Sequence, residues 1–234
     1  PVIRISRIGK ADWRYEEITH FGSSTQIKIR GVQGVLIEGV TKLIGDYNLD
    51  NLLMAVAIAV ESGVDPIEIS ANLNSYIGAP GRLEQVNVGQ DFLAFVDYAH
   101  TPDAVTHTLH TANKLGERVI AVLGCGGDRD ATKRSLMGIE LSSGSDLAIF
   151  TSDNPRSESA ESILDEMLSR VSIDDKNVRI TDRREAIAFA VASAKEGDCV
   201  VILGKGHELG QEISGQVLPF DDRVELAKAI EALS

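Results

Sequence analysis

The chain has 234 residues, with 35 acidic and 23 basic side chains and a formal net charge of −12 at pH 7. This length favours one full domain plus part of another. The acidic balance argues against nucleic acid and anionic membranes as partners, since both select basic surfaces. No apolar run reaches the roughly 18 residues needed to cross a bilayer. Cys125 and Cys199 lack the spacing of a metal site or a disulfide framework. We therefore expect a cytoplasmic protein whose two cysteines are small buried hydrophobic residues.

The N-terminal part of the chain predicts strands followed by two helices. Residues 1–40 alternate apolar and polar side chains, as in "VIRIS" and "QIKIRG", which is typical of antiparallel strands and hairpins. Residues 47–63 form a strongly apolar helical pattern closed by Gly63, and residues 65–77 form a second with Pro66 in its first turn. Because the chain starts at Pro1 rather than methionine, we expect a fragment whose beginning lies upstream.

The pattern changes after "GAPGRLE", residues 78–84, whose two glycines and proline predict a hinge. Beyond it, helical stretches separate five short and nearly continuous apolar runs: "FLAFVDYA", "RVIAVLG", "DLAIFTS", "NVRITD" and "CVVILG". Strands of this kind are buried on both faces, and the helices between them make parallel crossovers. The sequence thus predicts an α/β fold, a doubly wound and mainly parallel sheet, for the second half.

Four polar, glycine-bearing loops follow the predicted strands. They are "DYAHTPDA", "GCGGDRDATKRSLMG", "SDNPR" and "GKGHE", which start at Asp97, Gly124, Ser152 and Gly204. An ordinary connection needs only a helix cap and a turn residue. Ligands of such sheets bind beyond the carboxyl ends of the strands. We therefore predict the functional site at this edge.

The first two loops carry groups that could face a ligand, and the second suits an anion. Thr101 is suited to cap the helix that follows, which leaves Asp97 and His100 to face a ligand. In the second loop, Arg129 stands where a dinucleotide fingerprint needs its third glycine, so a nicotinamide cofactor is not expected. Its backbone N–H groups and cationic side chains suit a phosphate or a carboxylate. For Lys133 and Arg134 a solvated, salt-bridged loop is the alternative.

The last two loops carry charged side chains that could bind a ligand. "GKGHE" lacks the Ser or Thr that follows the lysine of a phosphate loop, and the chain contains no phosphate loop. Glu208 suits an ammonium group, while His207 is expected to pack beneath the loop as a structural histidine. In "SDNPR", Arg156 precedes a helix, whose N-terminal dipole repels cations. A ligand carboxylate therefore explains Arg156 better than a role as a surface charge.

Together these loops resemble the Mur ligases. "DYAHTPDA", "GCGGDRD..KR..MG", "TSDNPR", "GKGHE" and "FDDR" stand in that family's order, and "GDYNLDNLLMA" resembles the end of its central ATPase domain. The resemblance covers essentially the whole chain. It implies that residues 1–81 are the C-terminal α+β part of the central ATP-binding domain and that residues 82–234 are a Rossmann-like C-terminal ligase domain. The family's phosphate loop, magnesium ligands and modified lysine are expected upstream of Pro1.

The resemblance implies an ATP-dependent peptide synthetase of peptidoglycan biosynthesis with ATP and Mg²⁺ as cofactors. ATP would activate the carboxylate of a UDP-MurNAc-dipeptide as an acyl phosphate, which the amine of meso-diaminopimelate would attack. Catalytic residues are expected upstream, no metal site is expected in this chain, and a monomer is expected. The implied amino-acid-binding residues are Arg129, Asp153, Asn154, Pro155, Arg156, Gly204 and Glu208. The implied nucleotide-binding residues are Asn48, Asn51, Arg82, Asp97, His100 and Thr101.

Two alternatives remain open from the sequence. One is a relative that adds lysine, or one of the folylpolyglutamate type, which would share the "YNLDN" helix without carrying both DNPR and GKGHE. The other is a non-catalytic module that binds an amino acid. A phosphate loop upstream of Pro1 would favour the ligase. Within the ligase reading, Arg156 is expected to bind the distal carboxylate that meso-diaminopimelate has and lysine lacks.

Overall fold

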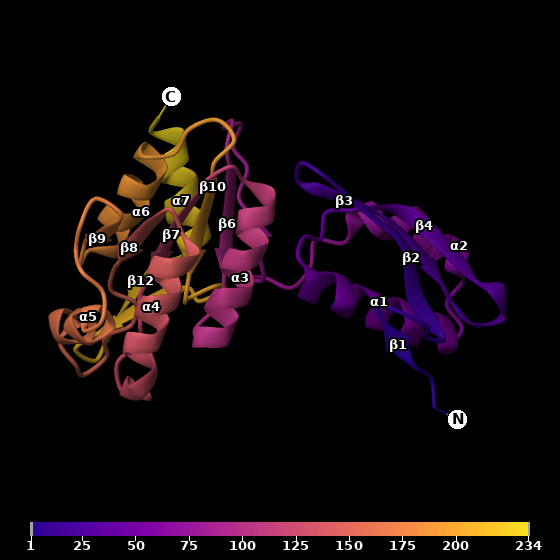
Figure 1. Ribbon diagram of the computed structural model, residues 1–234, viewed down its shortest axis with the longest axis horizontal. Helices are drawn as coiled ribbons and strands as arrows, with labels where there is room; N and C mark the ends of the chain where they lie inside the picture. The colour runs from indigo at the N-terminus through magenta and orange to yellow at the C-terminus, as the bar shows by residue number, and fades with distance from the viewer. Residues whose placement is uncertain (1, 234) are drawn as a thin grey trace. The chain divides into compact units, whose positions relative to one another are not determined.

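The computed structural model describes residues 2–233, which form two compact units, Pro1–Ala79 and Pro80–Ser234. The predicted α/β class is confirmed, with a mainly parallel sheet in the second unit (Figure 1). Each unit has its own hydrophobic core.

Unit 1 is a four-stranded sheet packed against two helices. Strands β2, β3 and β4 are antiparallel, as the alternating pattern predicts, whereas the short β1 pairs in parallel with β2. Trp13 and Leu49 lie in the core, and the Tyr15 hydroxyl donates to the carbonyl of Leu49 at 2.8 Å. The elements are β1 (Ile5–Ser6), β2 (Trp13–Phe21), β3 (Ser24–Arg30), the 3₁₀ turn η1 (Val32–Gly34), β4 (Leu36–Thr41), α1 (Asp46–Glu61), α2 (Pro66–Asn72) and the 3₁₀ turn η2 (Leu73–Ser75).

Unit 2 contains a six-stranded sheet in the order β5-β6-β10-β7-β8-β9. Five strands are parallel, and the short β5 is an antiparallel edge strand. The strands are β5 (Glu84–Gln85), β6 (Leu93–Asp97), β7 (Val119–Leu123), β8 (Leu147–Phe150), β9 (Asn177–Arg179) and β10 (Cys199–Leu203). The remaining elements are α3 (Pro102–Leu115), η3 (Ala131–Lys133), α4 (Arg134–Gly144), α5 (Ala160–Leu168), α6 (Arg183–Ala192), the hairpin of β11 (Gly210–Ile213) and β12 (Gln216–Pro219), and α7 (Asp222–Glu231).

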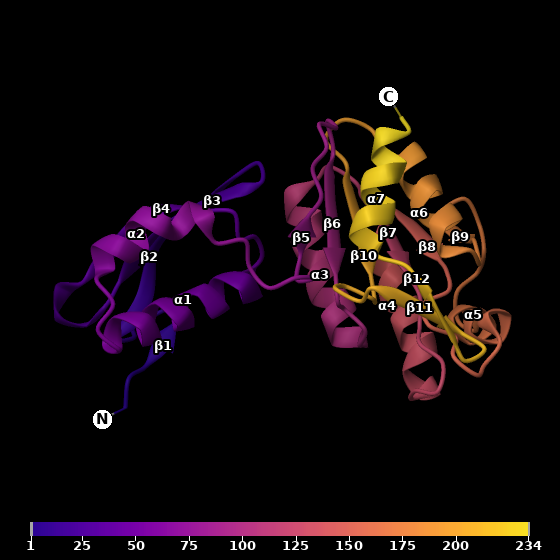
Figure 2. The same ribbon diagram turned by 180° about the vertical axis from the view of Figure 1, so that it is seen from behind.

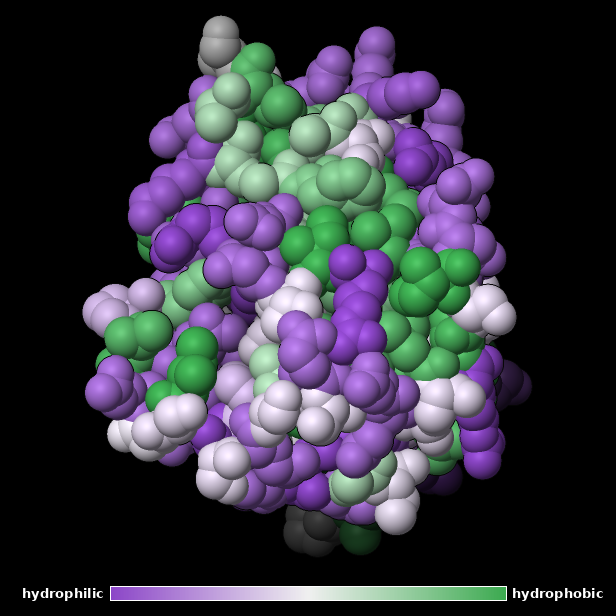
Figure 3. All heavy atoms as spheres, turned by 90° about the vertical axis from the view of Figure 1, so that its left-hand side faces the viewer, coloured by the Kyte–Doolittle hydropathy of each residue, from purple (hydrophilic) through white to green (hydrophobic). Residues whose placement is uncertain are grey.

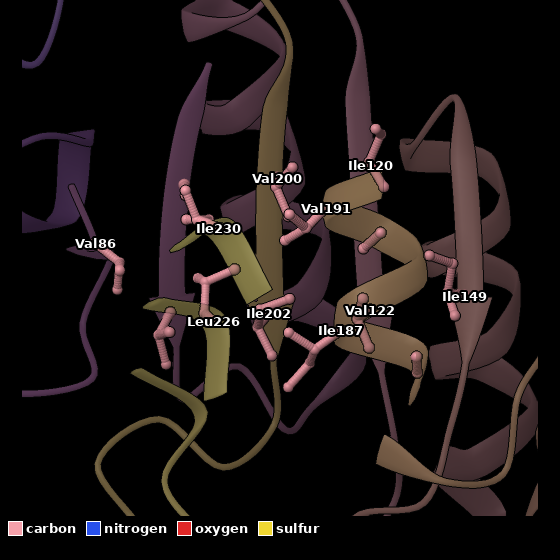
Figure 4. Close-up of a cluster of buried hydrophobic side chains, with 14 of the residues drawn as sticks. Val86, Ile120, Val122, Ile149, Ile187, Val191, Val200, Ile202, Leu226 and Ile230 are labelled. Atoms are coloured by element: carbon pink, nitrogen blue, oxygen red, sulfur yellow. The ribbon is translucent and has the colours of Figure 1, made fainter. Parts of the chain in front are cut away.

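Helices cover both faces of the sheet of unit 2. Figure 1 shows α3 and α4 over one face, and Figure 2 shows α6 and α7 over the other. Every residue of β7 and β10 is buried, which explains their continuous apolar sequences. In the core, side chains from the strands, among them Val122 and Ile202, lie against Ile187 of α6 and Leu226 of α7 (Figure 4).

The outer surface of unit 2 is mixed in character. Figure 3 shows apolar side chains gathered on the upper part of one face, near the chain end, with polar side chains over most of the remainder. Phe189 of α6 and Val224 of α7 are among the exposed apolar residues of these helices. Helices that bury one side therefore keep some apolar surface on the other, as is usual for folded proteins.

The strands that precede the four predicted loops end level with one another. Leu203 of β10 is in register with Asp97 of β6 and with Leu123 of β7, and Leu123 is in register with Phe150 of β8. Because these strands are parallel, the loops that follow them start side by side at one edge of the sheet.

The segment that enters unit 2 is fastened to the end of β6. The Tyr98 N–H donates to the carbonyl of Gly81 at 2.8 Å, and the Leu83 N–H donates to the Asp97 carboxylate at 2.8 Å. Residues 74–80 are exposed. Of the predicted hinge at 78–84, only the part before Gly81 therefore lacks such anchors to unit 2.

We expect limited proteolysis to distinguish the exposed residues that lead into the predicted hinge from the anchored residues inside it. Chymotrypsin should cleave after the exposed Tyr76 before trypsin cleaves after Arg82, although Arg82 is also exposed. The reason is that cleavage needs local unfolding, and the backbone on both sides of Arg82 is hydrogen-bonded. Mass spectrometry of the first fragments measures the order. Equal resistance at Tyr76 and at the buried Phe95 of β6 would argue against a hinge.

Candidate functional site

A cavity of about 430 Å³ lies in unit 2 and is lined by all four predicted loops. Eight predicted site residues line it: His100, Thr101, Arg129, Asp153, Asn154, Arg156, Gly204 and Glu208. The other lining residues are Tyr98, Gly124, Cys125, Gly126, Asp130, Lys133, Arg134 and Met137. The predicted residues Pro155, Asp97 and Arg82 are not among them, and Asn48 and Asn51 belong to unit 1.

Glycines allow the loops to pack backbone against backbone. A Cβ on Gly127 would lie 2.0 Å from the carbonyl oxygen of Pro155. Gly204 has a φ of +110°, and its Cβ would lie 2.6 Å from the Asp153 carboxylate. These contacts leave no room for a side chain. The glycines of the motifs therefore bring the loops after β7, β8 and β10 together, and Pro155 contributes backbone to that contact.

Arg156 is held in an unusual conformation at the cavity wall. Its φ is +53°, a left-handed value that is uncommon for a residue with a side chain. Its backbone N–H donates to the carbonyl of Glu212 at 3.0 Å, which fastens it to β11. Nη1 donates to the carbonyl of Gly127 at 2.6 Å, and Nε lies 3.4 Å from the Glu212 carboxylate. Nη2 has no partner among residues 2–233, so part of the guanidinium remains for a ligand.

Asn154 and Glu208 form one hydrogen-bonded cluster with Lys205. The Asn154 amide donates to Glu208 Oε2 at 2.7 Å. The Lys205 ammonium donates to Asn154 Oδ1 at 3.1 Å and to Glu208 Oε2 at 3.3 Å. Glu208 was predicted to receive a ligand ammonium, and it already pairs with the lysine of its own loop. Sequence reasoning missed this role, because it considered the lysine only as part of a phosphate loop.

Asp153 lies close to Lys205 in this group of hydrogen-bonded side chains. It is buried, its carboxylate is 3.9 Å from the Lys205 ammonium, and burial raises its pKa above the ordinary value for aspartate. The charges of Arg183 and Lys205 oppose this rise in the pKa. Asp153 therefore adds a second carboxylate to the inner wall of the cavity.

The cations of the second loop have separate roles. Arg134 is buried, and it donates to the carboxylates of Glu158 and Glu166 at 2.8 and 2.9 Å. Neither predicted role fits Arg134, because both its hydrogen-bonding amino groups are used inside the fold. The hydrogen bond with Arg134 lowers the pKa of Glu158 to about 2. Lys133 is half-exposed and lies 3.6 Å from Asp130, as a solvated salt bridge would. Arg129 is exposed at the cavity.

The first loop combines structural contacts with groups that line the cavity. The Asp97 carboxylate is buried and accepts hydrogen bonds from Leu83 N, Ala99 N and the Thr108 hydroxyl. The Thr101 hydroxyl caps α3, as predicted, and His100 is exposed, with Nδ1 2.7 Å from the Tyr98 carbonyl. Asp97 thus anchors the chain that enters unit 2, and its role toward a nucleotide stays a prediction.

The other predicted nucleotide residues are distributed between the units. In unit 1 the side-chain amide of Asn48 is buried and donates to the carbonyl of Ile44 at 2.8 Å, whereas Asn51 is exposed on α1. In unit 2 the Arg82 guanidinium lies over the Tyr98 ring, 5.4 Å from its centroid. Their roles toward a nucleotide stay predictions.

The expectation for His207 is wrong. Its side chain is exposed, and its ring lies 5.3 Å from that of Tyr98 rather than beneath the loop. Lys205 is fully buried instead, and Gly206 packs so closely that a Cβ would lie 2.6 Å from Tyr98 Cβ. The buried space under the loop therefore holds the lysine and the glycine.

Both cysteines are buried, as predicted. Burial raises the pKa of each thiol to about 12, so neither is a reactive thiolate near neutral pH. Within residues 2–233, no three His, Cys, Asp or Glu side chains form a cluster able to hold a metal ion. In the same part of the chain, no helix has the length and apolar character needed to span a membrane.

Comparison with known proteins identifies the family. A family model described as "Mur ligase, glutamate ligase domain" matches residues 81–206. The UDP-N-acetylmuramoyl-L-alanyl-D-glutamate--2,6-diaminopimelate ligase of Streptomyces coelicolor is 43% identical over 99% of this chain and 47% of that protein. The ligase of the same name from Aquifex aeolicus is 46% identical over 86% of this chain and 41% of that protein. The chain thus spans less than half the length of these relatives.

Solved structures agree with this result. A structure of a ligase with the same name matches 97% of this chain and 46% of its own, with a TM-score of 0.71 and 38% identity. A folylpolyglutamate synthase of Mycobacterium tuberculosis shares the fold, with a TM-score of 0.64 at 19% identity over 95% of this chain and 48% of its own. The resemblance that the loop motifs indicate is confirmed by the family match over more than half of the sequence: this chain belongs to the Mur ligase family.

Proposed function

We propose that this chain provides the amino-acid-binding region, and part of the nucleotide-binding region, of an ATP-dependent ligase that adds meso-diaminopimelate to UDP-MurNAc-L-Ala-D-Glu. The observation that carries the proposal is that Arg156 and Glu208 line one cavity with Asn154. A cation and an anion in one cavity suit a ligand end that bears both a carboxylate and an ammonium group. Relatives of the same family carry this activity in their names.

Different charged side chains of the cavity are available to different charged groups of the amino acid. Nη2 of Arg156 is available to a distal carboxylate, and Oε1 of Glu208, which has no partner among residues 2–233, is available to the distal ammonium. Arg129, exposed at the same cavity, suits a second carboxylate. This set favours meso-diaminopimelate over lysine, which has no distal carboxylate to pair with Arg156.

ATP and Mg²⁺ belong to the proposal through other parts of the chain and of the complete protein. ATP supplies the phosphoryl group that activates the acceptor carboxylate. Thr101 and His100 lie at the N-terminus of α3, where backbone N–H groups and the helix dipole favour an anion. The Mg²⁺ ligands are proposed to lie outside this chain, as the resemblance to the Mur ligases implies.

The proposal is tested by joining this chain to the N-terminal half of the Streptomyces coelicolor ligase. We expect phosphate release that requires both UDP-MurNAc-L-Ala-D-Glu and meso-diaminopimelate, with a product of the summed mass less water. The 234-residue chain alone should fold and release no phosphate, because it contains no phosphate loop to hold the transferred phosphoryl group. Phosphate release assays and mass spectrometry of the product give both results.

Other outcomes would contradict this function. Use of a folate substrate with glutamate by the joined protein would indicate the folylpolyglutamate type. Phosphate release by the isolated chain would show that its catalytic groups are not upstream. Binding of an amino acid by a joined protein that forms no product would favour a binding module.

A further inference from the structure

Lys205 is a buried cation that does not reach the cavity surface. It is fully buried, whereas Asn154 and Glu208, its two side-chain hydrogen-bond partners, line the cavity. Its third hydrogen bond, of 2.6 Å, goes to the carbonyl of Gly210 at the start of β11. A buried ammonium is costly unless its hydrogen bonds are made. Here all three are made, and two of them are to residues of the proposed amino-acid site.

The contacts of Lys205 determine how Asn154 is oriented. Asn154 Oδ1 accepts from Lys205 and from the Glu212 N–H at 2.8 Å. With both donors on the oxygen side, the amide nitrogen is directed to Glu208 Oε2. Oε2 therefore receives the Asn154 amide and the Lys205 ammonium, while Oε1 has no partner among residues 2–233.

The Lys205 ammonium also lies near two carboxylates. Two carboxylates face it, Asp153 from the loop after β8 and Glu208 from its own loop. Farther out, Asp222 of α7 neutralises Arg183 of α6 in an ion pair of 2.7 Å. Without the ammonium, Asp153 and Glu208 would repel each other with no cation between them. Lys205 therefore lies between the two carboxylates and holds Glu208 in place through an ion pair of 3.3 Å.

We propose that Lys205 is a positioning residue. It holds Asn154 and Glu208 so that Glu208 Oε1 can bind the distal ammonium of the incoming amino acid. This inference rests on the proposed function and extends it to a residue that does not touch the ligand. It predicts a selective defect. Loss of Lys205 impairs recognition of the distal amine, while recognition of the distal carboxylate by Arg156 is retained.

The test uses the complete ligase and two amino acids, meso-diaminopimelate and 2-aminopimelate, which has both carboxylates but lacks the distal amine. The preference is measured as the ratio of kcat/KM for meso-diaminopimelate to that for 2-aminopimelate. We expect Lys205→Met to lower this ratio by about 10- to 100-fold, because hydrogen bonds to a charged group typically contribute that much. KM for ATP should not change. Lys228→Met, which removes an exposed lysine of α7, is the matched control and should keep the wild-type ratio.

Coupling to Glu208 separates positioning from a general structural role. In a Glu208→Gln background, Lys205→Met should change the ratio little, because the group that Lys205 positions is already altered. Should Lys205→Met not accumulate as folded protein, Lys205→Gln, which keeps a hydrogen-bond donor but no charge, takes its place and should lower the ratio in the same way.

The possible outcomes are distinct. An unchanged ratio, or an equal loss of kcat/KM for both amino acids, would overturn the positioning role. Full additivity with Glu208→Gln would overturn it as well. If the wild-type ligase used neither amino acid, the proposed function itself would be wrong, and this result is obtained before any Lys205 variant is measured.

Discussion

On the proposed function, replacing Arg156 with alanine in the complete ligase is expected to abolish most of the selectivity for meso-diaminopimelate over lysine. When lysine occupies the site, the guanidinium loses its carboxylate partner. Sites built to pair a polar group typically reject a ligand that lacks it by about 10⁴-fold. Arg156 is only about one-fifth exposed, and Nη1 and Nε are already engaged by protein oxygens. The desolvated guanidinium is thus held in one orientation, which strengthens discrimination.

The measurement is the ratio of kcat/KM for meso-diaminopimelate to that for lysine. We expect Arg156→Ala to lower this ratio by about 100-fold or more, the usual effect of truncating one partner of a buried charge pair. In Arg156→Lys this ratio should lie between those of the wild type and of Arg156→Ala, because an ammonium keeps the positive charge but lacks the paired N–H donors that bind a carboxylate bidentately. Arg170→Ala removes an exposed arginine that does not line the cavity and should leave the ratio unchanged. An unchanged ratio in Arg156→Ala would refute the assignment.

Replacing Asp222 with alanine is expected to lower the stability of unit 2 by about 3–5 kcal/mol, since it leaves a buried charge without its partner. Arg183 and Asp222 are both fully buried and share two hydrogen bonds, of 2.8 and 2.7 Å. Arg183 also donates to the carbonyls of Ser152 and Leu203, which immediately precede Asp153 and Gly204. Through these hydrogen bonds the ion pair stabilises the starts of two loops of the candidate site.

Hydrogen exchange of the amides of β8 and β10 measures the free energy of unfolding of unit 2 directly. Asp165→Ala is the matched control, because its carboxylate also pairs with an arginine at 2.7 Å but is 69% exposed. Exposed pairs contribute about 1 kcal/mol or less. Equal effects of the two substitutions would show that burial of the Arg183–Asp222 pair does not contribute to stability.

The parallel sheet and the position of the cavity could be predicted because both depend on local patterns. Five apolar runs separated by helical stretches are sufficient for a parallel sheet, and parallel strands align their carboxyl ends. Glycines in the loops after β7 and β10 likewise indicate close approach of the backbone, which the structure shows at Gly127 and Gly204. Eight of the predicted residues consequently line one cavity.

The partners of the charged residues could not be predicted. Arg134 pairs with Glu158, 24 positions away, and Arg183 pairs with Asp222, 39 positions away. Nothing in a local pattern selects such a partner among 35 acidic residues. The same limit applies to Lys205, whose three acceptors lie on two loops and at the start of β11.

The sequence by itself determined the family, the fold class and the edge of the sheet that carries the cavity, because hydrophobic periodicity and glycine-bearing motifs act over short distances along the chain. Only the tertiary structure decided which charged side chains face the cavity and which support it from within. Arg129 and Arg134 stand in the same loop, yet one is exposed at the cavity and the other is buried. The physical reason is that the cost of burying a charge is offset only by partners that folding brings together from distant parts of the chain.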